Sequence, residues 1–291
     1  MAAAMERKPD WLKVQYDRQA VQEVAELMRD LHLNTVCKEA NCPNLGECYR
    51  KHTATFMIMG SQCTRNCRFC NVSCGKPQPL DPEEPERVAQ AAKKLGLRHV
   101  VITQVTRDDL PDGGAGHMAM TVQAVKSACP GMTVEVLISD LKGDPAALQT
   151  VLEAEPDVMN HNVEMVKEFY RSVRPQAIYE RSLGVLAESK RLFPKILTKT
   201  GFMLGLGETA EQVDVLLDDI RKTGCDILTI SQYLQPSKEH WPLARYVSPE
   251  EFAFWKEKAM EKGFRYVASS PLVRSSYRAA EALDAARDVK G

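Results

Sequence analysis

Short apolar runs alternate with amphipathic, helix-like segments along most of the chain. Six runs rich in aliphatic and β-branched residues predict buried strands, over Thr53–Gly60, His99–Val105, Thr133–Ser139, Asp157–Val163, Lys199–Gly205 and Ile227–Leu234. The segments between the first five predict helices over Glu86–Leu95, Met118–Cys129, Pro145–Glu153 and Tyr179–Phe193. This alternation predicts a parallel sheet whose strands are joined by helical crossovers.

Capping signals predict two more helices on either side of the sixth strand. Two residue pairs have the spacing of a capping box, Thr209 with Gln212 and Ser248 with Glu251. Pro249 occupies a first helical position, and Gly224 and Gly263 suit the left-handed residue that follows a helix. These helices complete six strand–helix units.

The six units extend over residues 53–264. About 210 residues for six units matches the size per unit of an eight-fold barrel of ~250 residues. We therefore predict an α/β fold, a partial (β/α)6 TIM-type barrel, with an N-terminal extension over 1–52 and a C-terminal tail over 265–291. A doubly wound sheet is the alternative, and in either fold chemistry is expected at the carboxyl ends of the strands.

Composition and charge exclude several classes of protein. Hydrophobic residues make up 44% of the 291 residues, and 38 Lys and Arg balance 39 Asp and Glu. This balance provides no broad positive field, so we expect neither nucleic acid nor a membrane surface as a partner. No apolar run reaches the ~18 residues of a membrane span, and Met1–Asp10 does not resemble a signal peptide. We expect a cytoplasmic protein; an organellar address stays open, since a transit peptide could precede this sequence.

The cysteines are clustered. Seven of the nine lie between residues 37 and 74. Disulfides are rare in the cytoplasm, and an odd total does not fit a disulfide framework. The clustering therefore indicates metal binding.

Three of these cysteines follow the first predicted strand. Cys63, Cys67 and Cys70 have the spacing C-x3-C-x2-C. Three thiolates on one short loop can hold three irons of a [4Fe–4S] cube and leave the fourth iron open for S-adenosylmethionine (SAM). A structural zinc site with Cys74 as fourth ligand is the alternative; the aromatic Phe69 and the preceding strand favour iron and sulfur.

A second triad precedes the barrel. Cys37, Cys42 and Cys48 have the spacing C-x4-C-x5-C, with Pro43 and Gly46 to turn the loop. They could hold a second cluster, again one ligand short. The alternative, that they are buried apolar residues, fits poorly with the polar residues that flank them.

These motifs resemble known families. A C-x3-C-x2-C loop after a strand is similar to the signature of the radical SAM superfamily. Both triads together resemble the lipoyl synthase family over nearly the whole chain, and three further motifs resemble it too: Arg107-Asp-Asp-Leu-Pro-Asp-Gly-Gly114, Asn160-His161-Asn162 and Arg274-Ser275-Ser276-Tyr277.

The resemblance implies a radical SAM sulfurtransferase that inserts two sulfur atoms at C6 and C8 of a protein-bound octanoyl group. It implies two [4Fe–4S] clusters and two SAM per turnover, with the auxiliary cluster consumed as sulfur source. The cluster ligands are then the only catalytic groups. Ser275 is implied as fourth ligand beside Cys37, Cys42 and Cys48, with Ser276 left open as the alternative.

The implied partners are octanoylated lipoyl carrier domains, namely E2 subunits of 2-oxoacid dehydrogenases and the glycine cleavage H protein. An electron donor such as flavodoxin or ferredoxin and an iron–sulfur carrier are implied as well.

Several residues after the strands are candidates for SAM binding. Gly113 and Gly114 would let the backbone approach the methionine part, unless they form a plain turn. Asn160 and Asn162 point the same way by period-two alternation and could hydrogen-bond SAM, with a structural role as the alternative. Arg174 could bind the SAM carboxylate or be a surface residue.

Other residues receive weaker interpretations. Gly205-Leu206-Gly207-Glu208 resembles the family's glycine turn on the adenine side. His161 is more simply a core histidine than a ligand, and Cys129 and Cys225 are interpreted as packing residues.

Two other functions remain open from sequence. Another radical SAM enzyme with an auxiliary cluster would share the Cys63–Cys70 loop without needing the second triad joined to R-S-S-Y. A non-enzymatic iron–sulfur or zinc-binding protein would not need so large a barrel.

Overall fold

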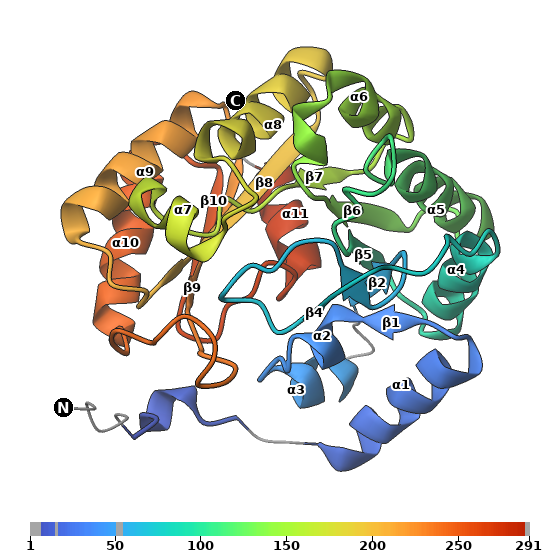
Figure 1. Cartoon of the computed structure of the whole chain (residues 1–291), viewed down its shortest axis with the longest axis horizontal. Coiled ribbons are helices and arrows are strands. Elements are labelled where there is room, and N and C mark those ends of the chain that lie inside the picture. The colour runs from blue at the N-terminus through green and yellow to red at the C-terminus, as the bar shows by residue number, and fades with distance from the viewer. Residues whose placement is uncertain (1–6, 15–16, 51–54, 289–291) are drawn as a thin grey trace.

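A parallel sheet forms the centre of the molecule. The computed structural model describes residues 7–14, 17–50 and 55–288, and within them the parallel strands are β2 (Thr55–Ile58), β5 (His99–Gln104), β6 (Thr133–Leu137), β7 (Val158–Asn160), β8 (Leu197–Leu204), β9 (Ile227–Gln232) and β10 (Tyr266–Ser269). A short strand, β1 (Asn34–Thr35), pairs antiparallel with β2. The strand order runs from β1 to β10, and no pairing among the described residues closes the ring. The sheet is thus an open barrel (Figure 1).

The predicted fold class is confirmed, and the main sheet has two strands more than the sequence predicted, the antiparallel β1 and the parallel β10. β10 lies in the segment predicted as tail and pairs in parallel with β9. Its four residues are only partly apolar and lie just before Ser270-Pro271, so the hydrophobic pattern did not reveal it. Thr53, Ala54 and the predicted boundary between residues 52 and 53 lie outside the described residues.

Helices cover the outer face of the barrel (Figure 1). They are α4 (Glu84–Lys94), α5 (Ala115–Ala128), α6 (Pro145–Glu153), α8 (Tyr179–Leu192), α9 (Ala210–Lys222) and α10 (Pro249–Glu261). Both side-chain bonds of the predicted capping box form at Thr209 and Gln212, and Ser248 accepts from the Glu251 amide. Gly224 and Gly263 have φ of 81° and 91°, as expected for residues that follow a helix.

Further elements lie toward the two ends of the chain and in the loops. They are η1 (Asp10–Leu12), α1 (Arg18–Asp30), α2 (Val36–Glu39), α3 (Leu45–Arg50), β3 (Gln62–Cys63), β4 (Ser73–Cys74), η2 (Leu141–Gly143), η3 (Lys167–Phe169), α7 (Tyr170–Val173) and α11 (Ala279–Asp288).

The C-terminal helix closes the amino end of the barrel. One face of α11 shares an apolar cluster with the first residues of β7, β8 and β9. The helix contributes Ala282, Leu283 and Ala286, and the strands contribute Val158, Leu197 and Ile227. This segment was predicted only as a tail. Its position fixes the course of residues 270–278, which run back toward the N-terminal extension.

The middle of the barrel is charged. The side chains of Glu135 on β6 and Lys199 on β8 are each 1% exposed, and the Lys199 ammonium lies 2.9 and 3.0 Å from the two Glu135 oxygens. Burial alone would raise the pKa of Glu135, but Lys199 and then His99 hold it below its ordinary value. Eight-fold barrels usually fill this layer with branched apolar side chains. A buried ion pair here is therefore a feature that needs explanation.

We expect Glu135→Ala to lower the free energy of unfolding by about 3–5 kcal/mol, because it leaves the Lys199 charge buried without its partner. Replacing both residues by apolar ones of similar size, Glu135→Leu with Lys199→Met, should recover most of this loss. Chemical denaturation of the full chain measures both. Equal losses in the single and double variants would contradict the role of the pair.

Candidate active site

The first cysteine triad lies on a loop between two short strands. Cys63 ends β3, Cys67 and Cys70 follow in the loop, and β4 pairs with β3 in parallel. The backbone of this loop bonds to its surroundings on two sides, through Thr64 N–H to Thr106 O at 3.0 Å and Arg68 N–H to Val173 O at 2.8 Å. The loop is therefore fastened to the segments that follow β5 and β7. These are the carboxyl ends of the strands, as predicted.

The three thiols affect one another electrostatically. Burial, together with negative charge on Cys67 and Cys63, raises the pKa of Cys70 to about 12. Burial also raises the pKa of Cys67, against the opposing effect of the nearby Arg174 guanidinium. Thiolates are the ligands of iron–sulfur clusters, and the positive metal would offset the charge that these three would otherwise crowd together.

Arg65, between the first two cysteines, anchors this loop. Its guanidinium binds both carboxylate oxygens of Asp108, at 2.7 and 2.9 Å, and one oxygen of Asp140 at 2.7 Å. The side chains of Arg65 and Asp140 are 4% and 0% exposed. Burial would lower the pKa of Arg65, but hydrogen bonds to the two carboxylates raise it above its ordinary value. Neither Arg65, which lies inside the cysteine motif, nor Asp140 was predicted from sequence to have a role. Asp108 was included only as part of the Arg107–Gly114 motif.

The second triad lies on the N-terminal extension. Cys37 is in α2 and buried in the core, Cys42 follows α2, and Cys48 is in α3; the last two pack against the same core. Burial raises the pKa of Cys37 to about 11, with a further contribution from Cys42. The Cys42 amide also bonds to the Cys37 carbonyl at 3.0 Å, so two of the predicted ligands are close together.

The C-terminal segment lies against this second triad. The Asn44 side chain donates to Leu272 O at 2.6 Å, and the Tyr277 hydroxyl lies 3.2 and 3.3 Å from the Glu47 oxygens. Burial lowers the pKa of Arg274, and the nearby Cys42 opposes this effect. The structure thus brings R-S-S-Y next to C-x4-C-x5-C across more than 200 residues, as the resemblance implied.

The two serines of R-S-S-Y have different neighbours. Ser275 Oγ accepts from Asn160 Nδ2 at 2.8 Å and donates to Asn162 Oδ1 at 3.1 Å. Ser276 Oγ accepts from Thr55 Oγ1 at 2.8 Å. Ser275 therefore faces the asparagines at the end of β7, and Ser276 faces the beginning of β2.

Gly113 and Gly114 are required by packing. Both have positive φ, 62° and 88°, and Gly114 caps α5. A Cβ on Gly114 would lie 2.3 Å from the Met59 sulfur, and one on Gly113 would lie 3.2 Å from Leu141 Cδ2. These contacts account for both glycines without a ligand, so the plain-turn interpretation is sufficient for them, and their role in SAM binding stays a prediction.

Buried polar atoms without partners remain near the same end of the barrel. Among the described residues they include Gln104 Oε1, Asn160 Oδ1, His161 Nε2 and Arg174 Nε. Buried polar groups in native proteins are nearly always hydrogen-bonded, so these atoms fit a polar ligand such as SAM. Arg174 is 8% exposed, which makes the surface-arginine alternative wrong.

One nitrogen of His161 and the amides of the glycine turn have partners within the protein, whereas His161 Nε2 has none among the described residues. His161 is 2% exposed, its Nδ1 lies 2.9 Å from Ile138 O, and burial, with Arg174, lowers its pKa to about 4. It is a neutral core histidine, as interpreted. The amides of Gly205, Leu206 and Gly207 bond to the Glu208 carboxylate at 2.7 to 3.1 Å, so this turn binds its own side chain.

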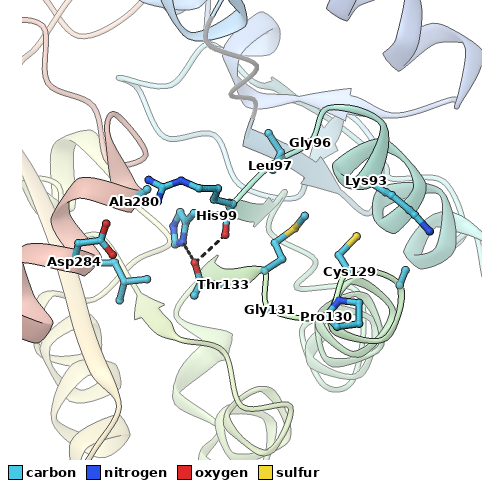
Figure 2. Close-up of a pocket in the computed structure, with 14 residues that line it drawn as sticks. Lys93, Gly96, Leu97, His99, Cys129, Pro130, Gly131, Thr133, Ala280 and Asp284 are labelled. Carbon is cyan, nitrogen blue, oxygen red and sulfur yellow. Dashed lines mark hydrogen bonds between the residues drawn. The ribbon is translucent and has the colours of Figure 1, made fainter.

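Two cavities lie near the amino ends of the strands, opposite the loop of the first triad. One of about 700 Å³ opens between the beginnings of β5 and β6, with Lys93, His99, Cys129, Thr133 and Asp284 among its lining residues (Figure 2). A neighbouring cavity of about 390 Å³ is lined in part by Cys48, Ser276 and Tyr277.

Within the described ranges, no helix is long and apolar enough to cross a membrane. No three His, Cys, Asp or Glu side chains in those ranges are grouped to hold a single metal ion. Cys225 is buried and Cys129 half-buried, and neither is in a disulfide.

Comparisons with known proteins agree with these motifs. The family model described as the radical SAM superfamily matches residues 57–220. A curated lipoyl synthase of Caldanaerobacter subterraneus subsp. tengcongensis is 56% identical over 97% of this chain and 99% of its own length. Lipoyl synthases of Rubrobacter xylanophilus and Alkaliphilus metalliredigens are 55% and 52% identical, over 96% and 98% of this chain and 88% and 99% of their own lengths.

Solved structures share the fold. Streptococcus suis SuiB bound to S-adenosylmethionine has a TM-score of 0.58 at 12% identity, over 86% of this chain and 60% of its own. Methylornithine synthase (PylB) has a TM-score of 0.55 at 15% identity, over 91% of this chain and 82% of its own. At such identities the likeness concerns the fold alone, and it supports the partial barrel.

We expect Arg65→Ala to lower the free energy of unfolding by about 3–5 kcal/mol, because it leaves the carboxylate of Asp140 buried with only the more distant Arg181, at 3.4 Å, as a charged partner. Arg68 on the same loop is exposed and stacks on Trp241, so Arg68→Ala should cost no more than about 1 kcal/mol. Denaturation of both variants measures the difference. Similar losses would show that Arg65 does not anchor the loop.

Proposed function

The chain belongs to the lipoyl synthase family of the radical SAM superfamily, and from this we propose that its two cysteine triads divide the work of inserting two sulfur atoms into a protein-bound octanoyl group. The observation that carries this proposal is the position of the C-terminal R-S-S-Y segment against the second triad. A carrier or another radical SAM enzyme would not need that arrangement.

The residues present fit the cofactors of this family. Cys63, Cys67 and Cys70 would hold the [4Fe–4S] cluster that, with SAM at its open iron, supplies the radical that removes hydrogen from carbon. Cys37, Cys42 and Cys48, with Ser275, would hold the auxiliary [4Fe–4S] cluster that supplies sulfur. Serine oxygen is a harder ligand than thiolate and matches iron–sulfur chemistry less well, which suits a cluster that must come apart.

The protein itself positions the reactants. The hydrogens at C6 and C8 of an octanoyl group have no acidity that a base could use, so acid–base residues are not required. The chain's part is to fasten the loop of the first triad through Arg65 and to supply polar groups for SAM, such as the buried Arg174 Nε and the half-buried Asn162 side chain. Gly113 and Gly114 shape the adjoining turn.

The partners follow from this function. The substrates would be octanoylated lipoyl domains of E2 subunits and the glycine cleavage H protein, and Arg171, exposed near the buried Arg174, suits an acidic carrier surface. A flavodoxin or ferredoxin would supply electrons, an iron–sulfur carrier would restore the auxiliary cluster, and the cytoplasm is the expected compartment.

The experiment that tests this proposal separates the two triads. Alanine at Cys63, Cys67 or Cys70 should abolish formation of deoxyadenosine. Alanine at Cys37, Cys42 or Cys48 should spare SAM cleavage but block sulfur insertion. The assay incubates each anaerobically reconstituted variant with SAM, reductant and an octanoylated lipoyl-domain peptide, and mass spectrometry measures both products.

Cys129→Ala is the matched control, because this half-buried thiol belongs to neither triad; it should retain both products. Lipoyl peptide from a variant of the second triad would refute the assignment of the sulfur source. Deoxyadenosine from a variant of the first triad would refute the assignment of the SAM cluster.

A further inference from the structure

The hydroxyl of Ser275 is held by a side chain from inside the barrel. Asn160 is fully buried at the end of β7, and its Nδ2 donates to two acceptors, Ser275 Oγ and Glu135 Oε1, both at 2.8 Å. An amide nitrogen has two hydrogens, so this atom has no further hydrogen to donate. Only Oδ1 of Asn160 is left without a partner among the described residues.

Glu135 determines the direction of this amide. A carboxylate can only accept hydrogen bonds, so the nitrogen of Asn160, and not its oxygen, must face Glu135. The same nitrogen then faces Ser275, whose oxygen accepts and whose proton points to Asn162 Oδ1 at 3.1 Å. The serine oxygen therefore accepts a hydrogen bond from the barrel interior, with Asn160 Nδ2 as the donor.

The buried ion pair keeps Glu135 ionised and in place. Lys199 contacts both oxygens of Glu135, and both side chains are 1% exposed. Asn160 lies between them in the sheet, since its register partners are Leu137 on β6 and Lys199 on β8. The Glu135–Lys199 ion pair, which is unusual in a barrel interior, thus holds the Asn160 side chain in one orientation.

We propose that Asn160, oriented by the Glu135–Lys199 pair, is a positioning residue for Ser275: its Nδ2 holds the serine oxygen in place to serve as fourth ligand of the auxiliary cluster. This inference rests on the proposed function. When Oγ binds iron the O–H bond breaks, and the proton leaves on the side of Asn162 and passes to water. Partners behind a metal ligand commonly contribute about 10- to 100-fold to metal affinity.

This role differs from the SAM contact predicted for Asn160 from sequence. Both of its side-chain N–H hydrogens are engaged within the protein. The half-buried Asn162 instead accepts from Ser275 through its Oδ1, and its side chain also hydrogen-bonds to Glu164. Of the two asparagines in Asn160-His161-Asn162, Asn160 therefore donates to the serine oxygen, and Asn162 accepts the serine proton's hydrogen bond.

The test measures iron release from the auxiliary cluster. The full-length chain with Cys63, Cys67 and Cys70 replaced by alanine is reconstituted so that only the auxiliary cluster forms, and loss of iron to a chelator is followed with time. Asn160→Leu, of similar size, should accelerate the loss by at least about tenfold. Mössbauer spectra should show the signal of the oxygen-ligated iron diminished in this variant.

Two substitutions at the serine are the matched controls. In a Ser275→Ala background, which lacks the oxygen, Asn160→Leu should have no further effect. In a Ser275→Cys background, where the ligand needs no such support, its effect should be less than about twofold.

Each other outcome overturns the inference. Fast release in Ser275→Ala with an unchanged rate in Asn160→Leu would leave the serine as ligand but remove the role of Asn160. An equal effect of Asn160→Leu with and without Ser275 would show that it acts through the fold. No effect of Ser275→Ala would refute serine ligation itself, and a matching effect of Ser276→Ala would assign the ligand to Ser276.

Discussion

The contacts of Arg65 with Asp108 and Asp140 determine where the first cysteine triad meets the barrel. Asp108 follows β5 and Asp140 follows β6, so one guanidinium joins the cysteine loop to two neighbouring strand ends. A planar cation that binds a carboxylate through two parallel bonds fixes direction as well as distance. The chemistry of the family needs a cluster at a defined position above the sheet, and this buried contact provides it.

The second triad is positioned by the opposite end of the chain. Helix α11 fills the amino end of the barrel, and the residues just before it pass along the N-terminal extension. The N-terminal extension and the C-terminal segment thereby meet at the second triad. The ion pair of Glu135 and Lys199 has a role in this arrangement, because Asn160 links Glu135 to Ser275 in the C-terminal segment. The polar layer inside the barrel supports a site, whereas an apolar layer would only fill space.

The fold and both triads could be predicted from sequence because they depend on local patterns. Six apolar runs predicted six of the strands, and cysteine spacing predicted the two triads, whose role as cluster ligands stays a prediction. Arg65, Glu135 and Lys199 were missed because their partners are distant in sequence, up to 75 residues away for Arg65 and Asp140. A signal existed: Glu135 and Lys199 are charged residues within predicted buried strands, where an unpaired charge would be too costly. For Gly113 and Gly114 the positive φ and the contacts with Leu141 and Met59 are sufficient reasons for glycine, and their role in SAM binding stays a prediction.

The two triads are held in ways that match a permanent and a consumable cluster. The first is on a loop fastened by buried ionic contacts and backbone bonds to strand ends, which resist rearrangement. The second is on two short helices, α2 and α3, and its remaining side is covered by an irregular segment near the chain end. A cavity lined in part by Cys48 and Ser276 adjoins it. Under the proposed function the second cluster loses sulfide and has to be rebuilt, and the ionic contacts of Arg65 that anchor the first triad do not involve the second.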